Sequence, residues 1–333
     1  MKIFITGVAG FLGSHIADRF LSRGHEVVGC DNLFGGSLEN VNPQVTFHNH
    51  DMTNLDGFAT MMAGCDVVYH CAAAAYEGVS LFAPSFICEN IFTGSVNTFT
   101  AAIQAGARRI VYCSSMARYG TNAVPFLESY EPNPQDPYGI AKEAAERVLV
   151  NLCNTHGVDY VIAVPHSIYG PRQKYDDPYR NVVSIMANLM LQGRPPIIYG
   201  DGEQKRCFSH IEDCISSLEA MASSPDVVGE VINIGPDEEF VTINELASRL
   251  SNIVGFNGEP VYVPGRPAEV KLATCSADKA RRLLGYETTV FLDDGLRDLV
   301  DDIRRRGPKP FDYHFGVEIR NHLTPRTWTE RMF

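Results

Sequence analysis

The chain has 333 residues, of which 45% are hydrophobic and 20% charged, a composition that excludes a disordered or fibrous protein. Its formal net charge is −12 and its basic residues are scattered, which argues against a nucleic-acid partner. No segment approaches the roughly 18 uninterrupted apolar residues of a membrane-spanning helix. We therefore expect no membrane partner and a cytoplasmic location.

The nine cysteines are widely spaced and form no Cys-x-x-Cys pair. Most of them lie in apolar segments, where a reduced thiol packs as a small hydrophobic side chain. We therefore expect free thiols, with neither disulfides nor a metal site.

Short runs of apolar and β-branched residues alternate with helical patterns along the chain. In the helical pattern 14–23 the apolar residues form one stripe, and Gly24 supplies a left-handed stop. Strands that alternate with helices predict βαβ units and a parallel sheet covered on both faces. The predicted fold class is α/β, with a doubly wound sheet of the Rossmann type. Its strands are expected at residues 3–6, 26–30, 66–71, 109–115, 160–165 and 231–234.

Two lobes are expected from the length of the chain. Residues 1–168 carry the regular alternation and form the first lobe. Residues 169–333 form mainly a smaller, mixed α/β lobe, with the strand near 231–234 returning to the first sheet. The tail 307–333 contains three prolines and the only tryptophan, Trp328. Such a tail needs a surface to dock on, either on this chain or on a partner.

Three glycines, Gly7, Gly10 and Gly13, follow the first predicted strand and open the first predicted helix. This spacing allows a tight turn, a close backbone approach to a pyrophosphate, and close packing of helix on strand. We expect Phe11 and Leu12, within the same turn, to contact the cofactor as well.

Asp31 closes the second predicted strand, 24 positions after Gly7. A carboxylate there accepts hydrogen bonds from the 2′-hydroxyl of NAD and repels the 2′-phosphate of NADP, so NAD is the expected cofactor. Asp31 and Asn32 also fit an ordinary turn. Further along, Asp51 and Met52 fit adenine contacts and a surface turn equally well.

Tyr138 and Lys142 lie four residues apart in a helical stretch and therefore share one helix face. An ammonium beside a phenol lowers the pKa of the phenol, which would make Tyr138 a usable base. The same lysine can hold the nicotinamide ribose, and we expect Tyr138 to contact the cofactor as well. Ser114 and Ser115 end the predicted strand 109–115, where a hydroxyl can relay a proton to Tyr138 or cap the next turn.

These motifs occur in one order along nearly the whole chain, and together they resemble the extended short-chain dehydrogenase/reductase family. The resemblance is to its group of nucleoside-diphosphate-sugar epimerases and dehydratases. It implies that Ser115 partners Tyr138 and that Asn90 and Pro165 lie near the cofactor. The residues that carry the resemblance are Gly7 to Gly13, Asp31, the run Ala72, Ala73 and Ala74 after His70, Asn90, Ser114 and Ser115 before Tyr119, Tyr138 with Lys142, and Tyr169 to Gln173.

The resemblance also implies the reaction. Tyr138 is expected to remove the C4 hydroxyl proton of a nucleotide-linked sugar while NAD takes the C4 hydride, which gives a 4-keto sugar. Dehydratases of this group carry an Asp-Glu pair after the active-site hydroxyl, and the decarboxylases carry a Glu at the second of these positions. This chain has Met116 and Ala117 there, and neither side chain can transfer a proton. We therefore expect a hexose C4-epimerase, which needs no further acid or base.

The resemblance assigns the nucleotide sugar to the second lobe and to one loop of the first. Arg206 and Arg266 are expected to hold the diphosphate, because guanidinium groups match phosphate oxygens. Glu77 fits a contact to sugar hydroxyls or a solvated loop carboxylate equally well. Ser167 stands where relatives usually have asparagine, which weakens its expected phosphate contact. The remaining substrate-binding candidates are Met116, Asn181, Val182, Tyr199 and Glu269.

Other functions stay open from the sequence. A dehydratase with an unfamiliar acid and base and a 4-keto sugar reductase are enzyme alternatives, and an NAD-binding scaffold is the non-enzyme alternative. NAD that survives purification favours the epimerase, whereas a requirement for added NADH favours the reductase. The family also implies a homodimer through the helical segments 92–103 and 138–153.

Overall fold

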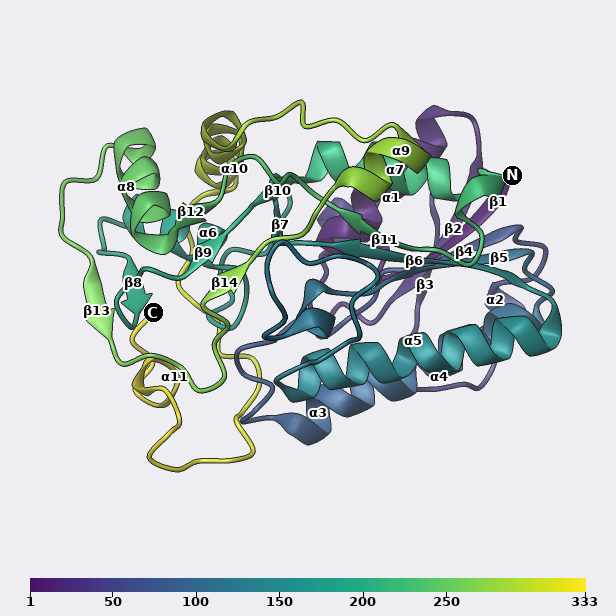
Figure 1. The fold of residues 1–333 in the computed structure, drawn as a ribbon, viewed down its shortest axis with the longest axis horizontal. Coiled ribbons are helices and arrows are strands. Elements are labelled where there is room, and N and C mark those ends of the chain that lie inside the picture. Colours follow the sequence, from purple (N-terminus) through teal and green to yellow (C-terminus); the bar gives the residue numbers. More distant parts are fainter.

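A computed structural model describes all residues, 1–333. Its main element is a sheet of seven parallel strands in the order β11-β6-β5-β4-β1-β2-β3 (Figure 1). This architecture confirms the predicted α/β class with a doubly wound parallel sheet. The strands are β1 (Lys2–Thr6), β2 (Glu26–Asp31), β3 (Thr46–Asn49), β4 (Val67–His70), β5 (Arg109–Cys113), β6 (Asp159–Pro165) and β11 (Val231–Ile234).

Helices cover both faces of this sheet (Figure 1). Ile3 and Ile5 of β1 pack into one core and Phe4 into the other, because successive side chains of a strand point to opposite faces. Both faces are therefore buried and apolar, as parallel sheets require. One face carries α1 (Phe11–Ser22), α7 (Ile211–Met221) and α9 (Asp278–Leu284); the other carries α2 (Phe58–Met61), α3 (Pro84–Cys88), α4 (Gly94–Gln104) and α5 (Pro137–His156).

The second half of the chain contributes to both parts of the molecule. Its strand β11 pairs with β6, and helices α7 and α9 pack against the core of the first sheet. The rest builds a smaller lobe around α6 (Val182–Leu191), α8 (Ile243–Val254) and α10 (Leu292–Arg306). Its short strands are β7 (Ile168–Tyr169), β8 (Ile197–Tyr199), β9 (Lys205–Arg206), β10 (Ser209–His210), β12 (Val241–Thr242), β13 (Val261–Val263) and β14 (Leu272–Ala273).

Local sequence signals fix the ends of several helices. Thr242 and Glu245 form a reciprocal capping box at the start of α8, and Gly255 ends that helix in the left-handed conformation with φ of 80°. Single 3-10 turns occur at Leu38–Asn40, Met116–Tyr119 and Pro225–Val227, and a π-helical turn, Glu89–Thr93, joins α3 to α4.

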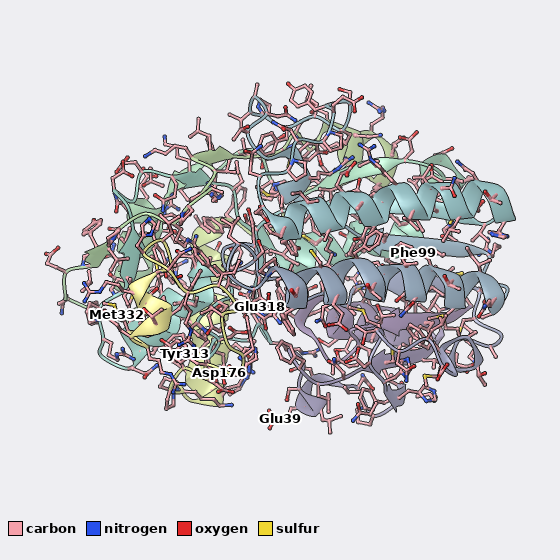
Figure 2. The ribbon with its side chains drawn as sticks, turned by 90° about the horizontal axis from the view of Figure 1, so that it is seen from below. Glu39, Phe99, Asp176, Tyr313, Glu318 and Met332 are labelled. Atoms are coloured by element: carbon pink, nitrogen blue, oxygen red, sulfur yellow. The ribbon has the colours of Figure 1, made fainter.

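The tail 307–333, which includes α11 (Arg326–Thr329), docks on its own chain (Figure 2). It runs across the second lobe and reaches the first lobe at Glu318, whose carboxylate accepts hydrogen bonds from the backbone of Ser85 and Phe86. Trp328 is buried against Phe82. Of the two docking surfaces considered from the sequence, the structure therefore uses the chain itself.

Two further features of the molecule are the state of its cysteines and the character of its helices. All nine cysteines are free thiols. None of the helices combines the length and the apolar character needed to cross a bilayer.

Candidate active site

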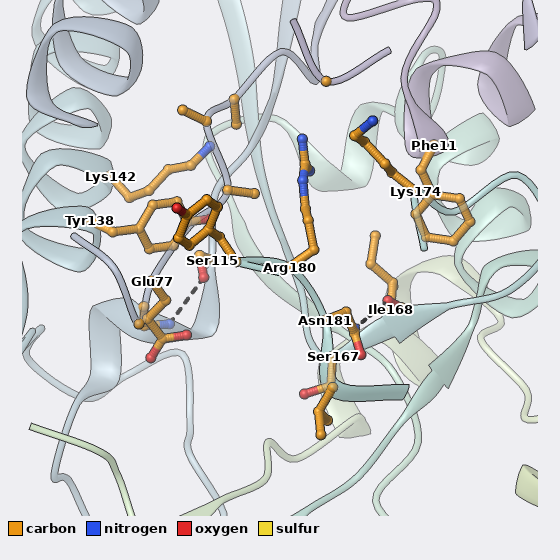
Figure 3. A pocket seen from close by; sticks show the side chains of 18 of the residues that line it. Phe11, Glu77, Ser115, Tyr138, Lys142, Ser167, Ile168, Lys174, Arg180 and Asn181 are labelled. Carbon is orange, nitrogen blue, oxygen red and sulfur yellow. Dashed lines mark hydrogen bonds between the residues drawn. The ribbon is translucent and has the colours of Figure 1, made fainter. Parts of the chain in front are cut away.

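A cavity of about 490 Å³ lies between the carboxyl edge of the seven-stranded sheet and the second lobe. In open α/β sheets this edge is where ligands bind. Figure 3 shows side chains from both lobes facing one another across it. The predicted site residues that line it are Gly7, Gly10, Phe11, Leu12, Gly13, Asp31, Asn32, Met52, Ala72, Ala73, Ala74, Glu77, Asn90, Ser114, Ser115, Met116, Tyr138, Lys142, Pro165, Ser167, Asn181, Val182, Tyr199, Arg206, Arg266 and Glu269.

The glycine turn forms one end of the cavity. Gly7 has φ of +73°, and a Cβ there would lie 2.8 Å from the backbone of Ala72; a Cβ on Gly13 would lie 2.2 Å from the carbonyl oxygen of Gly7. Only glycine fits these positions. Helix α1 begins directly after this turn with no side chain capping it, so its first N–H groups face the cavity without intrahelical partners. This arrangement fits a pyrophosphate.

Asp31 lies at the end of β2, beside the glycine turn. Its carboxylate accepts hydrogen bonds from the backbone N–H of Ala9 (3.1 Å) and of Leu33 (2.8 Å). Burial raises the pKa of this carboxyl, while these two hydrogen bonds and the charge of Arg180 oppose the rise. The position of Asp31 fits the ribose-binding acid of an NAD site.

Asp51 differs from the other predicted cofactor residues because it does not line the cavity, although Met52 does. Its carboxylate instead accepts a hydrogen bond from the Asn32 amide at 2.8 Å and closes a turn by accepting from the backbone and hydroxyl of Thr53. The sequence fitted either an adenine contact or a surface turn, and these hydrogen bonds are those of a turn. Asp51 is linked to the cavity only by its hydrogen bond to Asn32, which lines it.

Tyr138 and Lys142 lie near the start of α5, on the face that points into the cavity (Figure 3). The helix starts here because Asp136 caps it, accepting from the backbone N–H of Gly139 at 3.0 Å, and because Pro137 occupies the first turn. The Lys142 ammonium donates to the carbonyl oxygen of Cys113 at 2.8 Å. Strand β5 thus sets the position of the lysine head group.

The expected lowering of the Tyr138 pKa by Lys142 is wrong for the protein by itself. Burial raises the pKa of the Tyr138 phenol, and the hydroxyl of Ser115 only partly opposes the rise. Burial also lowers the pKa of Lys142 to about 8. Desolvation is the largest cause of both shifts, and the nearby negative charges of Glu77 and Asp136 raise the pKa of Tyr138 further. An ionised Tyr138 therefore needs additional positive charge nearby.

The two serines after β5 take different positions. Ser115 faces Tyr138 and also caps the turn Met116–Tyr119, accepting from the backbone N–H of Ala117 at 3.2 Å (Figure 3). Ser114 lines the cavity wall but donates its hydroxyl proton to Glu146 of α5. The capping and the proton-relay interpretations of Ser115 are thus compatible, and Ser114 braces the helix.

A buried ion pair lies behind the catalytic candidates. The guanidinium of Arg118 lies 3.0 Å from the carboxylate of Glu146, and both side chains are almost fully buried. Together with Ser114 they join the turn after β5 to helix α5, which carries Tyr138. The sequence analysis missed this pair. The sequence feature that could have indicated it is Arg118, a charged residue between the apolar Ala117 and Tyr119.

The second lobe contributes two arginines to the cavity. Arg266 makes two hydrogen bonds to Glu269, at 2.9 and 3.0 Å, and its guanidinium stacks on the ring of Tyr199 with 4.5 Å between the carbon and the ring centroid. Arg206 donates to the carbonyl oxygen of Val270 at 2.7 Å. Both guanidinium groups are thereby held in place and retain free faces toward the cavity.

Glu77 carries an unpartnered carboxylate that is exposed to this cavity. It nevertheless lies deep enough in the protein that desolvation, aided by the charge of Asp136, raises its pKa to about 7. The positive charges of Arg206 and Arg266 oppose this rise. Glu77 is therefore a carboxyl that changes its charge near neutral pH, close to Tyr138 (Figure 3).

Arg180 is a cavity residue to which the sequence analysis gave no role. Its guanidinium lies over the ring of Tyr76 at 4.7 Å and donates to Asp177 at 3.3 Å. In Figure 3 it extends into the cavity between Tyr138 and Lys174. Its position directly before Asn181, a predicted substrate residue, was the available signal. Asn181 itself caps α6 and donates its amide to the carbonyl oxygen of Ile168 at 3.0 Å.

Comparisons with known proteins agree with this geometry. The sequence model of the NAD dependent epimerase/dehydratase family matches residues 3–235. A UDP-glucose 4-epimerase of Mycolicibacterium smegmatis is 32% identical over 316 residues, which cover 92% of this chain and 99% of the relative. A UDP-glucuronic acid decarboxylase 1 of Xenopus tropicalis is 31% identical over 310 residues, which cover 91% of this chain and 72% of the relative.

Solved structures give the same result. The UDP-glucose 4-epimerase of Thermotoga maritima, crystallised with UDP-glucose, has a TM-score of 0.86 and 32% identity, and the match covers 92% of this chain and 99% of that one. The UDP-glucuronic acid 4-epimerase of Bacillus cereus, in complex with UDP-glucuronic acid and NAD, has a TM-score of 0.85 and 30% identity over 92% of this chain and all of that one.

The buried charge of Lys142 yields a stability prediction. Its folded pKa of about 8 lies below its unfolded value, so the charged lysine costs stability below pH 8, and the cost fades as the pH rises from 8 toward 10.5. After subtracting about 1 kcal/mol for the lost hydrogen bond, Lys142→Met should stabilise the fold by about 2 kcal/mol at pH 7. Urea unfolding at pH 7 and pH 9.5 measures this gain and its decline.

The matched control is Lys271→Met, because Lys271 is an exposed lysine. It should change the urea midpoint little at either pH. A Lys142→Met variant less stable than the wild type at pH 7 would contradict the assignment of a strained, buried ammonium.

Proposed function

The chain belongs to the NAD dependent epimerase/dehydratase family, and on this premise we propose that it inverts C4 of a nucleotide-linked hexose, a UDP-hexose, through a transient 4-keto intermediate. The cofactor is NAD. One observation carries the proposal: Tyr138, Ser115 and Lys142 meet in a cavity that extends from the phosphate-binding turn to the arginines of the second lobe.

The residues of the first lobe fit NAD. The turn at Gly7, Gly10 and Gly13 would hold the pyrophosphate and Asp31 the adenosine ribose, while Lys142 would hold the nicotinamide ribose. The bound cofactor supplies a hydride acceptor and donor for C4, together with a positive charge beside Tyr138. That charge is the additional one that an ionised phenol requires here. We extend the assignment to the lining residues Phe11, Leu12, Asn32, Met52, Ala72, Ala73, Ala74, Asn90, Ser114 and Pro165, and to Asp51 through Asn32.

Tyr138 is the proposed base for the C4 hydroxyl and the proposed acid when the hydroxyl re-forms. Ser115 hydrogen-bonds the phenolate and the substrate oxygen, and Lys142 stabilises the phenolate electrostatically. Proton transfer at a single oxygen is all that this set can perform. Met116 and Ala117 line the same wall of the cavity and can accept no proton, so elimination and decarboxylation lack the groups that they use in relatives.

The second lobe is proposed to hold the nucleotide sugar. Arg206 and Arg266 would bind the diphosphate, because each guanidinium is already oriented by backbone or carboxylate partners. Glu77 would contact sugar hydroxyls. Residues 1–168 thus form the proposed cofactor lobe and residues 169–333 mainly the substrate lobe. The remaining proposed contacts are Met116, Ser167, Asn181, Val182, Tyr199 and Glu269.

Two further assignments belong to this proposal. The helices α4 and α5 lie side by side along one face of the molecule, which supports a homodimer through them (Figure 2). The cytoplasm is the proposed location, since the nine cysteines are all free thiols.

The proposed activity predicts turnover without added cofactor. Protein purified without NAD in the buffers should convert UDP-glucose or UDP-N-acetylglucosamine to its C4 epimer, with the product identified by NMR. UDP-glucuronate is the third substrate to test. Release of carbon dioxide, accumulation of a 4-keto product, or a requirement for added NADH would instead assign a decarboxylase, a dehydratase or a reductase.

Tyr138→Phe should lower kcat by about a thousandfold, because the loss of a general base typically costs 10²–10⁴. Tyr138 is also a proposed cofactor contact, but the NAD content of the purified variant should stay close to that of the wild type, because phenylalanine keeps the ring and the glycine turn, Asp31 and Lys142 still hold the cofactor. A Tyr138→Phe variant with wild-type turnover would remove the catalytic assignment and leave an NAD-binding scaffold.

Glu77 predicts a pH effect. The charged carboxylate raises the pKa of Tyr138, and the Glu77 pKa of about 7 means that this charge appears between pH 6 and pH 8. Glu77→Gln removes the charge, so Tyr138 should ionise more easily and the acidic limb of the kcat profile should move to lower pH by about half a unit. Initial rates from pH 5.5 to pH 9 measure the shift.

Glu259→Gln is the matched control, because Glu259 is exposed and remote from the cavity. Its profile should superpose on that of the wild type. An acidic limb that stays in place, or moves to higher pH, in Glu77→Gln would show that Glu77 does not act electrostatically on Tyr138.

A further inference from the structure

The tail 307–333 is fastened to both lobes. On the first lobe, the backbone N–H groups of Glu318 and Ile319 donate to the carbonyl oxygen of Phe82 at 2.7 and 3.0 Å. On the second lobe, Asn188 of α6 exchanges two hydrogen bonds with the backbone of Lys309, at 2.9 and 3.1 Å. The tail therefore spans the two halves between which the cavity lies.

Aromatic packing holds the tail between these attachments. The centroid of the Phe315 ring lies 5.0 Å from the ring centroid of Phe86 in the first lobe and 4.5 Å from that of Tyr179 in the second. The Trp328 ring packs against Phe82 and Tyr179, with centroid distances of 5.8 and 5.7 Å. Aromatic pairs of this kind stabilise a structure beyond the burial of their rings. The tail is thus a packed part of the fold.

The end of the tail reaches the cavity. Phe333 lines it, and the backbone N–H of Phe333 donates to the hydroxyl of Tyr313 at 3.1 Å. The Tyr313 hydroxyl in turn donates to the carbonyl oxygen of Thr327 at 3.1 Å. The Thr327 side chain is fully buried, and its hydroxyl shares a short hydrogen bond with the hydroxyl of Tyr199. Tyr199 is the residue through which the tail meets the candidate diphosphate site.

From these contacts we infer that the tail is a working part of the nucleotide-sugar site, in which Thr327 positions Tyr199 and thereby Arg266. The Arg266 guanidinium lies on the face of the Tyr199 ring while the Glu269 carboxylate binds its edge, so the ring and the carboxylate together set the orientation of the cation. The ligand class is a nucleoside diphosphate, whose phosphate oxygens match a guanidinium fork. The inference rests on the proposed function, because that function supplies the class of ligand.

A second tail residue contacts the side chains that hold Arg180, a third arginine of the cavity. The imidazole of His314 shares a 3.1 Å hydrogen bond with the hydroxyl of Tyr76, which donates to Asp177 at 3.0 Å. Tyr76 and Asp177 are the two residues that hold Arg180 in the cavity. The tail therefore supports two cationic groups, Arg266 and Arg180, from outside the cavity.

The proposed contribution of the tail is to ligand binding, and the chemistry at Tyr138 proceeds without it.

The test measures UDP binding by calorimetry on the full chain carrying its NAD. Thr327→Val removes the hydroxyl and keeps the shape of the side chain, so UDP should bind about fivefold more weakly, as expected for one lost hydrogen bond. KM for the nucleotide sugar should rise by a similar factor, while kcat and NAD content stay within twofold of the wild type. This split separates positioning of Arg266 from a general loss of structure.

Thr327→Ser keeps the hydroxyl and should bind UDP as the wild type does. Thr329→Val is the matched control, since the Thr329 hydroxyl is exposed and its only contact is the carbonyl oxygen of Arg326. Tyr199→Phe breaks the same hydrogen bond from its other end and should reproduce the Thr327→Val defect. The double variant should be no weaker than either single variant.

The inference would be overturned if Thr327→Val bound UDP with wild-type affinity, or if Thr327→Ser lost as much UDP affinity as Thr327→Val. Either result would leave the proposed function intact. A wild-type chain that binds no UDP would remove the proposed function itself, and the inference with it. Should Thr327→Val fail to fold, Thr327→Ala decides the question by the same measurements, because Tyr199 is itself a proposed substrate contact.

Discussion

All seven strands of the sheet run in one direction, and this constraint places their carboxyl ends along a single edge. The glycine turn after β1, Asp31 at the end of β2 and the serines after β5 are distant in sequence, yet each lies on that edge. The close approach of Gly7 to Ala72 completes it, because any side chain at Gly7 would separate β1 from the segment after β4. The cofactor half of the cavity therefore forms because the strands are parallel and because Gly7 has no side chain.

The site is assembled at an energetic cost. Lys142, Tyr138 and Glu77 each have a pKa shifted by burial in the direction that disfavours their charged forms. Burial of Lys142 and Glu77 costs stability at neutral pH because both are charged in the unfolded chain, whereas the Tyr138 phenol is neutral in both states. Perturbed groups of this kind gather at functional sites. The phenol lacks a sufficient positive charge in the protein by itself. A cationic nicotinamide bound beside Tyr138 would supply it, so the proposed acid–base chemistry would depend on the bound cofactor.

Rigid supports surround this strained centre. The Arg118–Glu146 pair with Ser114 ties helix α5 to strand β5 on one side. The tail, with Thr327 against Tyr199, ties the second lobe to the first on the other. In the proposed reaction a ketone must rotate before hydride returns, which would need space in the middle of the cavity and fixed groups at both ends.

Local sequence patterns determined much of this protein. The alternation of strands and helices predicted the α/β class, and the glycine spacing, Asp31, and the pair Tyr138 and Lys142 predicted which residues line the cavity, because each depends on a few neighbouring positions. Tertiary structure alone decided the rest. It turned Ser114 toward Glu146, kept Asp51 out of the cavity, brought Arg180 in, and docked the tail on its own chain. It also reversed the expected pKa shift of Tyr138, since desolvation depends on all surrounding atoms and not on the spacing of two residues.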